Sequence, residues 1–225
     1  MENEGLADHQ FMTLLTPDRQ RALRSLGRPQ RFRAGDTLLH TGQVGDRVMV
    51  ILAGRAKISY TTEAGHEVVL RFAGPGEVLG ELAVIDGRPR SGTIEAVEPV
   101  ETLTVGAADF LSFVNGDPDA TLALLRTLSA RCRDSDQKRI QFGAADSIGR
   151  ISLRLVELAE RFGEPDEDGV AITLPLTQEE LGSWCGCSRE AVAKGLQELR
   201  RLGTIETSRR RILVRDLDAL RRRAG

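Results

Sequence analysis

The stretch PLTQEELGSWCGCSREAVAKGLQELRRLGTIE, residues 175–206, contains two helix starts separated by a short turn. Thr177 and Glu180 form a T-x-x-E capping box that predicts a first helix, which ends at the turn around Gly186. Ser188 is placed to cap a second helix. The inward face of that helix is apolar, at steps of four and three residues: Val192, Leu196 and Leu199. Two short helices joined by a glycine turn are typical of a helix-turn-helix.

The outward face of the second helix carries groups that can bind base edges. Arg189 projects from the helix start, and Glu190 and Lys194 follow on the exposed side. An arginine fork donates to N7 and O6 of guanine, a glutamate accepts from the amino group of cytosine, and Lys194 can reach a guanine or a phosphate. Thr177 and Ser188, at the two helix N-termini, are placed to bind phosphate oxygens.

The segment GTIETSRRRILV, residues 203–214, predicts a β-hairpin wing after the second helix. Three arginines at its tip are well placed for DNA phosphates: Arg209, Arg210 and Arg211. The alternative is an ordinary two-helix corner with solvated charges. Charge distribution argues against it: the chain has a net charge of −2, but from residue 189 onward eleven Lys and Arg face five Asp and Glu. A basic end of +6 on a body of −8 favours a module that binds nucleic acid.

Residues 32–105 have the pattern of an antiparallel β-barrel. The segment GRAKISY, residues 54–60, alternates Ala56, Ile58 and Tyr60 with polar neighbours, and glycine turns recur along the region. Many short strands with frequent turns predict a sandwich or barrel, and therefore an α+β chain with a β-rich N-terminal domain.

From Asp117 the apolar spacing becomes helical, with Asp117 as a cap and Pro118 in the first helical position. A heptad-like seam runs along this helix: Leu125, Leu128, Cys132, Ser135, Arg139 and Phe142. We expect it to pair with its symmetry mate; the alternative is packing on its own barrel. The segment 142–147 is interpreted as a hinge and 163–169 as a polar loop. The expected domains are a barrel over 1–116, a dimerisation helix and hinge over 117–144, and a winged helix-turn-helix over 145–225.

Composition excludes several classes of protein. The 225 residues are 40% hydrophobic and 28% charged, without an apolar run of membrane-spanning length or an N-terminal signal-peptide pattern, so we expect a cytoplasmic protein that does not bind membranes. Three cysteines do not form a disulfide framework, and the lone pair Cys185 and Cys187 is a weak metal signal. No catalytic constellation is present, so we predict neither an enzyme, nor a metal site, nor a catalytic cofactor.

The order of barrel, long helix and winged helix-turn-helix, with GELAVIDGRPRSGTIEA at 80–96 and GCSREAVAKGL at 186–196, resembles the CRP/FNR family of bacterial transcription regulators. The similarity covers residues 32–214 and is greatest to the cyclic-AMP receptor protein branch. It implies a jelly-roll barrel of the cyclic-nucleotide-binding type. Other branches fit less well: Cys132 is the first cysteine, so the N-terminal iron–sulfur cluster of oxygen sensors has no ligands. The histidines do not match a haem-ligating position: His9, His40 and His66.

The resemblance implies a cyclic-nucleotide site around residues 80–91. Backbone N–H groups of Gly80, Glu81 and Leu82 would point at the phosphate, and the glycine permits close approach. Glu81 would accept from the ribose 2′-hydroxyl. Arg90 would pair with the cyclic phosphate and the hydroxyl of Ser91 would add a donor. Arg88 is a competing phosphate partner that the sequence leaves open.

The long helix would meet the base, with three residues near the adenine edge by family position: Arg131, Ser135 and Asp136. Ser135 can serve the adenine amino group, whereas Asp136 departs from the family's usual Ser or Asn. A carboxylate accepts well from the adjacent N1 and N2 donors of guanine, so cyclic GMP is an alternative to cyclic AMP as effector. Asp136 could instead face solvent or pair with Lys138.

The resemblance also implies a homodimer on a near-palindromic operator with TGTGA-like half-sites, and RNA polymerase as a partner. Two other interpretations remain. The protein could bind DNA without any nucleotide, its barrel serving as a scaffold. It could also be a nucleotide-binding module that does not bind DNA, although the winged helix argues against this.

Overall fold

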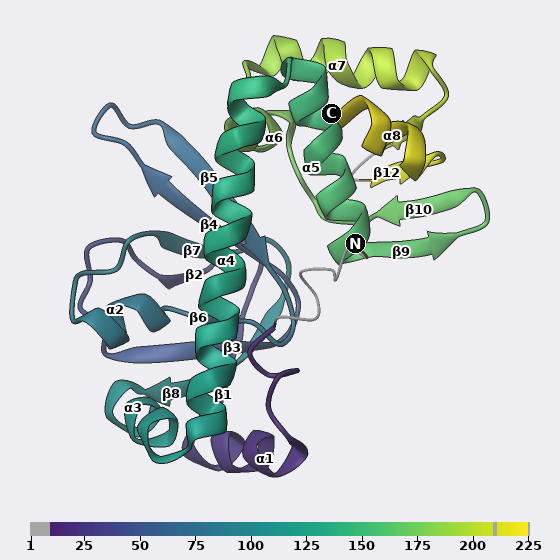
Figure 1. The fold of residues 1–225 in the computed structure, drawn as a ribbon. Coiled ribbons are helices and arrows are strands. Elements are labelled where there is room, and N and C mark those ends of the chain that lie inside the picture. Colours follow the sequence, from purple (N-terminus) through teal and green to yellow (C-terminus); the bar gives the residue numbers. More distant parts are fainter. Residues whose placement is uncertain (1–9, 209–210, 225) are drawn as a thin grey trace. The chain divides into compact units, whose positions relative to one another are not determined.

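The computed structural model describes residues 10–208 and 211–224, and leaves out the side chains of residues 141, 142 and 144. The chain forms two compact units, of which the first ends at Cys132 and the second begins at Arg133 (Figure 1). The boundary lies inside one continuous helix, α4 (Pro118–Ala144).

Two four-stranded antiparallel sheets form the body of the first unit. One sheet has the order β1 (Arg28–Phe32), β8 (Val100–Gly106), β3 (Arg47–Ala53) and β6 (Val78–Leu79). The other has the order β2 (Thr37–Leu39), β7 (Thr93–Ala96), β4 (Ala56–Thr61) and β5 (Glu67–Ala73). The predicted antiparallel jelly-roll is confirmed, although its sheets do not join into a closed barrel.

Strand β3 is buried on both faces, which explains its uninterrupted apolar sequence. Val48 and Val50 point into one cluster, with helices α1 (Pro17–Leu26) and α3 (Ala107–Gly116), while Met49 and Ile51 point into a second cluster toward the other sheet. Each fully buried side chain of this kind contributes about 1.5–3 kcal/mol relative to an exposed one.

The alternation predicted for residues 54–60 holds for Ala56 and Ile58, which pack in the core between the sheets, but is wrong for Tyr60, which is exposed. The register of β4 with β5 shifts between Ile58 and Ser59. Lys57 and Ser59, expected on the outward face, are buried. The buried Lys57 ammonium is paired with Glu67 on β5, 3.1 Å away. A β-bulge changes the direction of the side chains that follow it, here Ser59 and Tyr60, because two residues on one strand oppose a single residue on the other.

Helix α4 has two different faces within the first unit. Toward the barrel it buries one stripe of mostly small residues: Ala120, Ala123, Leu124, Thr127 and Ala130. The predicted seam lies elsewhere: Leu125 is 55% exposed, Leu128 packs partly on the core, and Cys132 is exposed. Packing on its own barrel therefore uses mainly a stripe other than the seam, with Leu128 shared between the two.

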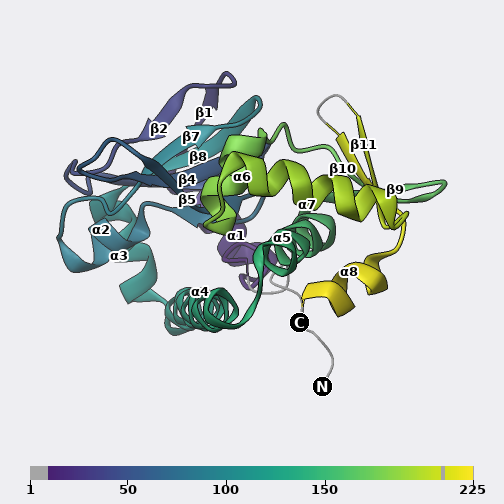
Figure 2. The same cartoon turned by 90° about the horizontal axis from the view of Figure 1, so that it is seen from above.

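The second unit combines a group of helices with one sheet. The helices α5 (Ser147–Phe162), α6 (Gln178–Cys185), α7 (Arg189–Arg201) and α8 (Leu217–Ala224) accompany a sheet of order β11 (Ile205–Ser208), β12 (Arg211–Val214), β10 (Gly169–Ile172) and β9 (Gly163–Asp166). Helix α5 packs against α6, α7 and α8, and Figure 2 shows α7 beside it.

Two predictions for this region need correction. The polar loop expected at 163–169 is a β-hairpin, because Gly163–Asp166 pairs with Gly169–Ile172 and only the turn between them is irregular. The hinge expected over 142–147 is narrower, since α4 continues to Ala144 and α5 begins at Ser147. Asp146 caps α5 by accepting from the N–H of Gly149.

No helix in the described part of the chain is both long enough and apolar enough to cross a membrane.

Candidate functional site

Arg90 is a buried cation at the centre of the first unit's candidate site. Its side chain is 3% exposed; Nη1 donates to the carbonyl of Gly80 at 3.3 Å, and Nη2 donates to the carbonyl of Arg47 at 2.9 Å. Nη2 also contacts Oδ1 of Asp46 at 3.1 Å. The buried Nε has no hydrogen-bond partner among the described residues. A guanidinium with an unused donor is suited to bind an anion.

Gly80 is required by its backbone and by its neighbours. It has a φ of +77°, in the left-handed region, at the position that caps α2 (Glu81–Asp86). A Cβ atom here would lie 2.4 Å from Nη1 of Arg90 and 2.7 Å from Cδ1 of Leu39. Only glycine lets the chain turn this close to the guanidinium.

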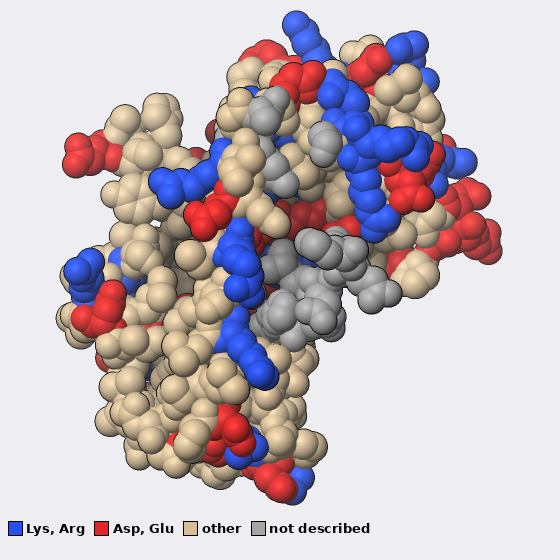
Figure 3. All heavy atoms as spheres, viewed as in Figure 1, with Lys and Arg blue, Asp and Glu red and all other residues tan. Residues whose placement is uncertain are grey.

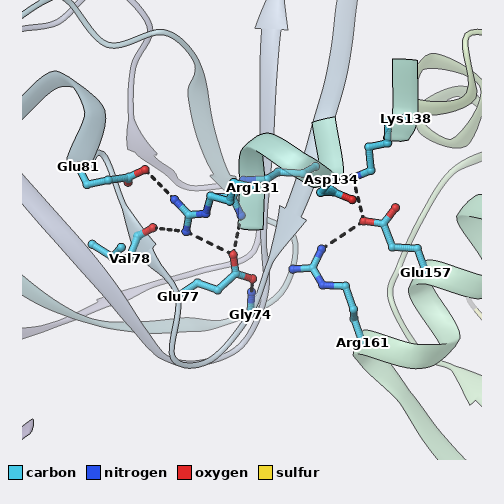
Figure 4. Close-up of polar contacts among 10 residues, drawn as sticks. Gly74, Glu77, Val78, Glu81, Arg131, Asp134, Lys138, Glu157 and Arg161 are labelled. Atoms are coloured by element: carbon cyan, nitrogen blue, oxygen red, sulfur yellow. Dashed lines mark hydrogen bonds and ion pairs between the residues drawn. The ribbon is translucent and has the colours of Figure 1, made fainter. Parts of the chain in front are cut away.

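Glu81 follows directly and is held by an arginine from α4. Its side chain is 5% exposed, and its Oε1 lies 2.6 Å from Nη1 of Arg131 (Figure 4). Nη2 of Arg131 donates to the carbonyl of Val78 at 2.8 Å and lies 3.5 Å from Oε2 of Glu77. The carboxylate of Glu81 therefore has a fixed position beside the loop that leads to Gly80.

The other residues predicted for the nucleotide site are more open. Leu82 is 48% exposed, and Ser91 and Arg88 are exposed. The burial of Arg90 and its contact with Gly80 favour Arg90 over Arg88 as the anion partner.

The residues expected at the base are exposed on the part of α4 that belongs to the second unit: Ser135 and Asp136. Lys138, the alternative partner of Asp136, is instead within 2.7 Å of Asp134 and 3.1 Å of Glu157. Arg131, expected near the base, contacts Glu81.

Two carboxylates at this site were missed by the sequence analysis. Asp46, which pairs with Arg90, lies among the glycine turns of residues 32–105 and was not singled out. Glu77 lies in another such segment, yet it is buried, accepts from the N–H of Gly74 at 3.0 Å and pairs with Arg71 at 2.6 Å. No local pattern distinguishes an acidic turn residue that pairs with a distant arginine from a solvated one.

The second unit contains the helix-turn-helix predicted from residues 175–206. Thr177 caps α6, and the reciprocal bond from Glu180 completes the capping box. Gly186 ends α6 in the left-handed conformation, with a φ of +59°. Ser188 caps α7 by accepting from the N–H of Ala191 at 3.2 Å. Three apolar residues of α7 are buried as predicted: Val192, Leu196 and Leu199.

The opposite face of α7 is exposed and charged. Arg189, Glu190 and Lys194 all point to solvent. Hydrogen bonds from the backbone N–H of Glu190 and from the hydroxyl of Ser188 lower the pKa of the Glu190 carboxyl. The carboxylate therefore stays ionised and acts as an acceptor near neutral pH. In Figure 3, basic side chains, with acidic ones among them, are spread over the part of the molecule where Figure 1 shows α7 and α8.

Strands β11 and β12 form the predicted wing, with Ser208 paired to Arg211. Arg209 and Arg210 lie outside the described residues. Arg211 is exposed and forms an ion pair with Asp166 of β9. The hydroxyl of Thr207 accepts from Nη1 of Arg200 at 3.0 Å, which links the wing to the end of α7.

The two cysteines that flank the turn of the helix-turn-helix, Cys185 and Cys187, contact other parts of the protein. Burial raises the pKa of the Cys185 thiol to about 12, so it remains a neutral core group. The Sγ of Cys187 lies 3.3 Å from Nη2 of Arg150. Within the described residues, no three His, Cys, Asp or Glu side chains gather in a way that could hold a metal ion.

Comparison with known proteins assigns a family to each unit. A model of the cyclic nucleotide-binding domain matches residues 29–117, and a model of the Crp-like helix-turn-helix domain matches residues 149–223. A CRP-like cAMP-activated global transcriptional regulator of Mycobacterium tuberculosis is 32% identical over 196 residues, covering 87% of this chain and 88% of that protein. The cAMP-activated global transcriptional regulator CRP of Salmonella typhimurium is 27% identical, covering 82% and 88%.

Solved structures have the same fold. A transcriptional regulator of the CRP/FNR family from Thermus thermophilus matches with a TM-score of 0.74 and 28% identity, covering 88% of this chain and 98% of that one. The c-di-GMP responsive global regulator of Xanthomonas campestris matches with a TM-score of 0.75 and 20% identity, covering 88% and 99%. Members of the matched family are transcription regulators rather than enzymes. The chain belongs to the CRP/FNR family of transcriptional regulators, in its cyclic-AMP receptor protein-like branch.

Proposed function

We propose that this DNA-binding regulator is controlled by cyclic AMP bound in its first unit. One observation carries the proposal: a buried guanidinium, that of Arg90, has an unused Nε donor beside a glycine that brings the backbone close. The cyclic phosphate would receive Arg90 together with backbone N–H groups of residues 80–82, and the hydroxyl of Ser91 would add a donor. Glu81, already oriented by Arg131, would accept from the ribose 2′-hydroxyl.

Asp46 competes with the phosphate for Arg90. The carboxylate of Asp46 is 59% exposed, so its pairing with Arg90 is screened by water and worth at most about 1 kcal/mol. A phosphate with two or more charge-assisted bonds replaces it at little cost.

The base end of the ligand selects between nucleotides. The hydroxyl oxygen of Ser135 would accept a hydrogen bond from the amino group of adenine, and the carboxylate of Asp136 would accept from the N1 and N2 donors of guanine. The relatives from M. tuberculosis and S. typhimurium are cAMP-activated regulators, which favours cyclic AMP. The X. campestris relative responds to c-di-GMP, so the fold alone does not identify the effector.

We propose that the protein is a homodimer joined along α4. The seam is supported by apolar side chains that the first unit leaves in solvent, among them Leu122 at 43% and Leu125 at 55% exposure. Two copies of α7 would then enter successive major grooves about 34 Å apart on a near-palindromic operator with TGTGA-like half-sites. RNA polymerase is the expected partner at the promoter.

Cross-linking through Cys132 tests the seam. Cys132 is exposed at a seam position of α4, and a parallel helix pair places such a residue beside its own copy. A short bis-maleimide is therefore expected to convert most of the protein into a covalent dimer, seen on denaturing gels. The control is Cys132→Ser, which keeps Cys185 and Cys187 and should remain monomeric on the gel. Failure to cross-link a protein that light scattering shows to be dimeric would move the interface away from this seam.

The proposed control is tested by DNA binding to a TGTGA-type palindrome, without nucleotide and with cyclic AMP or cyclic GMP. Tighter binding with cyclic AMP alone is the expected result. Tightening by cyclic GMP alone would assign the guanine-specific role to Asp136.

One observation favours a second candidate, DNA binding that does not depend on a nucleotide. Arg90 and Glu81 both already have charged partners within the protein, Asp46 and Arg131. A barrel whose buried charges are already paired within the protein could serve as a scaffold that binds no nucleotide. DNA affinity that no cyclic nucleotide changes would support this alternative.

A further inference from the structure

The second unit contains a buried charge cluster centred on Glu157 of α5. The side chain of Glu157 is 10% exposed, and three cations contact its carboxylate: Lys138 at 3.1 Å, Arg154 at 3.0 Å and Arg161 at 3.2 Å. Arg154 is on the same helix as Glu157. Figure 4 shows Arg161 approaching Glu157 from that helix and Lys138 approaching it from α4. Lys138 is thus the member that joins two helices.

The cluster keeps Glu157 ionised. Burial raises the pKa of the carboxyl, and the fields of Lys138, Arg154 and Arg161 together outweigh burial, so that the net pKa is lowered. A buried carboxylate with this many cations loses much more when a partner is removed than an exposed ion pair does. The contact from Lys138 is therefore an energetically significant link.

Lys138 also contacts the first helix of the helix-turn-helix. Its Nζ lies 5.9 Å from the ring centroid of Trp184, and the guanidinium of Arg154 lies 4.9 Å from the same ring. Trp184 is on α6 and is 2% exposed. Cations over a buried indole are attracted by its π-face. One lysine side chain thus links α4 to both α5 and α6.

The backbone joint that Lys138 bypasses is short. Only residues 145–146 separate α4 from α5, and Asp146 is occupied in capping α5 and in an ion pair with Arg223 at 2.7 Å. Lys138 reaches across this joint to a residue 19 positions further on. A shift of the α4 turn that carries Lys138 would therefore move α5 and α6 with it, as long as the contacts of Lys138 with Glu157 and Trp184 are kept.

We propose that Lys138 is a positioning residue, whose contacts with Glu157 and Trp184 form a clasp that makes the DNA-binding unit follow the end of α4. The proposal rests on the proposed function for its regulatory meaning, because Ser135 and Asp136, expected to meet the base, lie between Asp134 and Lys138 on α4. With the clasp closed, movement of that turn is transmitted to α6. With the clasp open, residues 145–146 change conformation instead, and the movement of the α4 turn is not transmitted to α6.

The first experiment requires neither nucleotide nor DNA. Amide hydrogen exchange of the full-length protein is compared for wild type, Lys138→Met and Arg133→Met. Methionine keeps the apolar stem but removes the charge, and Arg133 is an exposed cation on the same helix. We expect the amides of residues 133–141 to exchange about tenfold faster in Lys138→Met and to be unchanged in Arg133→Met. Lys138→Arg, which retains a cation, should restore protection.

Glu157→Gln provides an independent variant, because it breaks the clasp from the α5 side. It should loosen the same segment of α4 and also lower the unfolding temperature, since Arg154 and Arg161 lose their buried partner. Equal exchange in wild type, Lys138→Met and Glu157→Gln, with all of them folded, would overturn the clasp.

The second experiment separates the clasp from effector control. For wild type, the ratio of DNA affinities with and without cyclic AMP is expected within the usual allosteric range of about 5–150-fold, and for Lys138→Met it should fall toward one while nucleotide affinity stays unchanged. A Lys138→Met protein that keeps the full wild-type ratio would contradict the coupling role. If the wild type itself does not respond to nucleotide, the proposed effector control fails, and hydrogen exchange still decides the clasp.

Discussion

Arg90→Ala is expected to weaken the binding of cyclic AMP by at least about 30-fold. The substitution removes the only cation that the described structure buries beside Gly80, with its unused Nε donor. Removing one partner of a buried charged hydrogen bond costs about 2–5 kcal/mol, which corresponds to a loss of about 30- to 5,000-fold in affinity. Isothermal titration calorimetry measures the loss directly. Arg90→Lys should be intermediate, because an ammonium restores charge but not the fork.

Arg88→Ala is the matched control, since Arg88 is an exposed arginine two positions away and was the competing phosphate partner. Its affinity for cyclic AMP should stay within about twofold of wild type, as for surface charges generally. The fold should tolerate Arg90→Ala, because Asp46, the charged partner left behind, is largely in solvent, and the carbonyls of Gly80 and Arg47 each lose a single donor. Unchanged thermal unfolding would establish that the loss is local. An Arg90→Ala protein that binds cyclic AMP normally, with Arg88→Ala defective, would reverse the assignment.

Arg189→Ala is expected to remove sequence preference while leaving non-specific DNA binding nearly intact. Arg189 is exposed at the start of α7, where an arginine can contact guanine in the major groove. A bidentate contact discriminates between bases by about 1–3 kcal/mol, and a dimer makes it twice, giving about 2–6 kcal/mol for the two half-sites. Fluorescence anisotropy against a palindrome and against random DNA measures the two affinities.

Arg210→Ala provides the contrast. Arg210 lies outside the described residues; in the sequence it falls between β11 and β12, where the wing's phosphate contacts are expected, and such contacts carry no sequence information. This variant should weaken binding to both DNAs by the same factor and lower the slope of affinity against salt by about 0.9 for each phosphate that the protein no longer neutralises. Equal losses on specific and random DNA for Arg189→Ala would show that Arg189, too, contacts the phosphate backbone.

The helix-turn-helix was predictable from sequence because its signals are local. The capping box of Thr177 and Glu180, the left-handed Gly186 and the cap at Ser188 each depend on residues within a few positions. The jelly-roll was predictable as a class for a similar reason, since alternation and glycine turns specify strands one at a time.

Features that depend on distant pairs were not predictable. Lys57 of β4 is buried with Glu67 of the neighbouring strand as its ion-pair partner, and the pattern of a single strand carries no information about that partner. Asp46 joins Arg90 across 44 positions, and Lys138 joins Glu157 across 19. The hairpin of β9 and β10 has a polar first strand and a solvated turn. The sequence of residues 163–169 therefore lacks the apolar alternation from which a strand is predicted.

The unequal use of the two faces of α4 has a consequence for how the regulator responds to its own abundance. One face packs within the monomer, and in the proposed dimer the seam with Leu125 would be covered by a second copy. A palindromic operator is then read only by paired chains, whose number rises with the square of the free monomer concentration when pairing is weak. Halving expression would cut operator occupancy more than twofold, so gene dosage would act as an input beside the nucleotide.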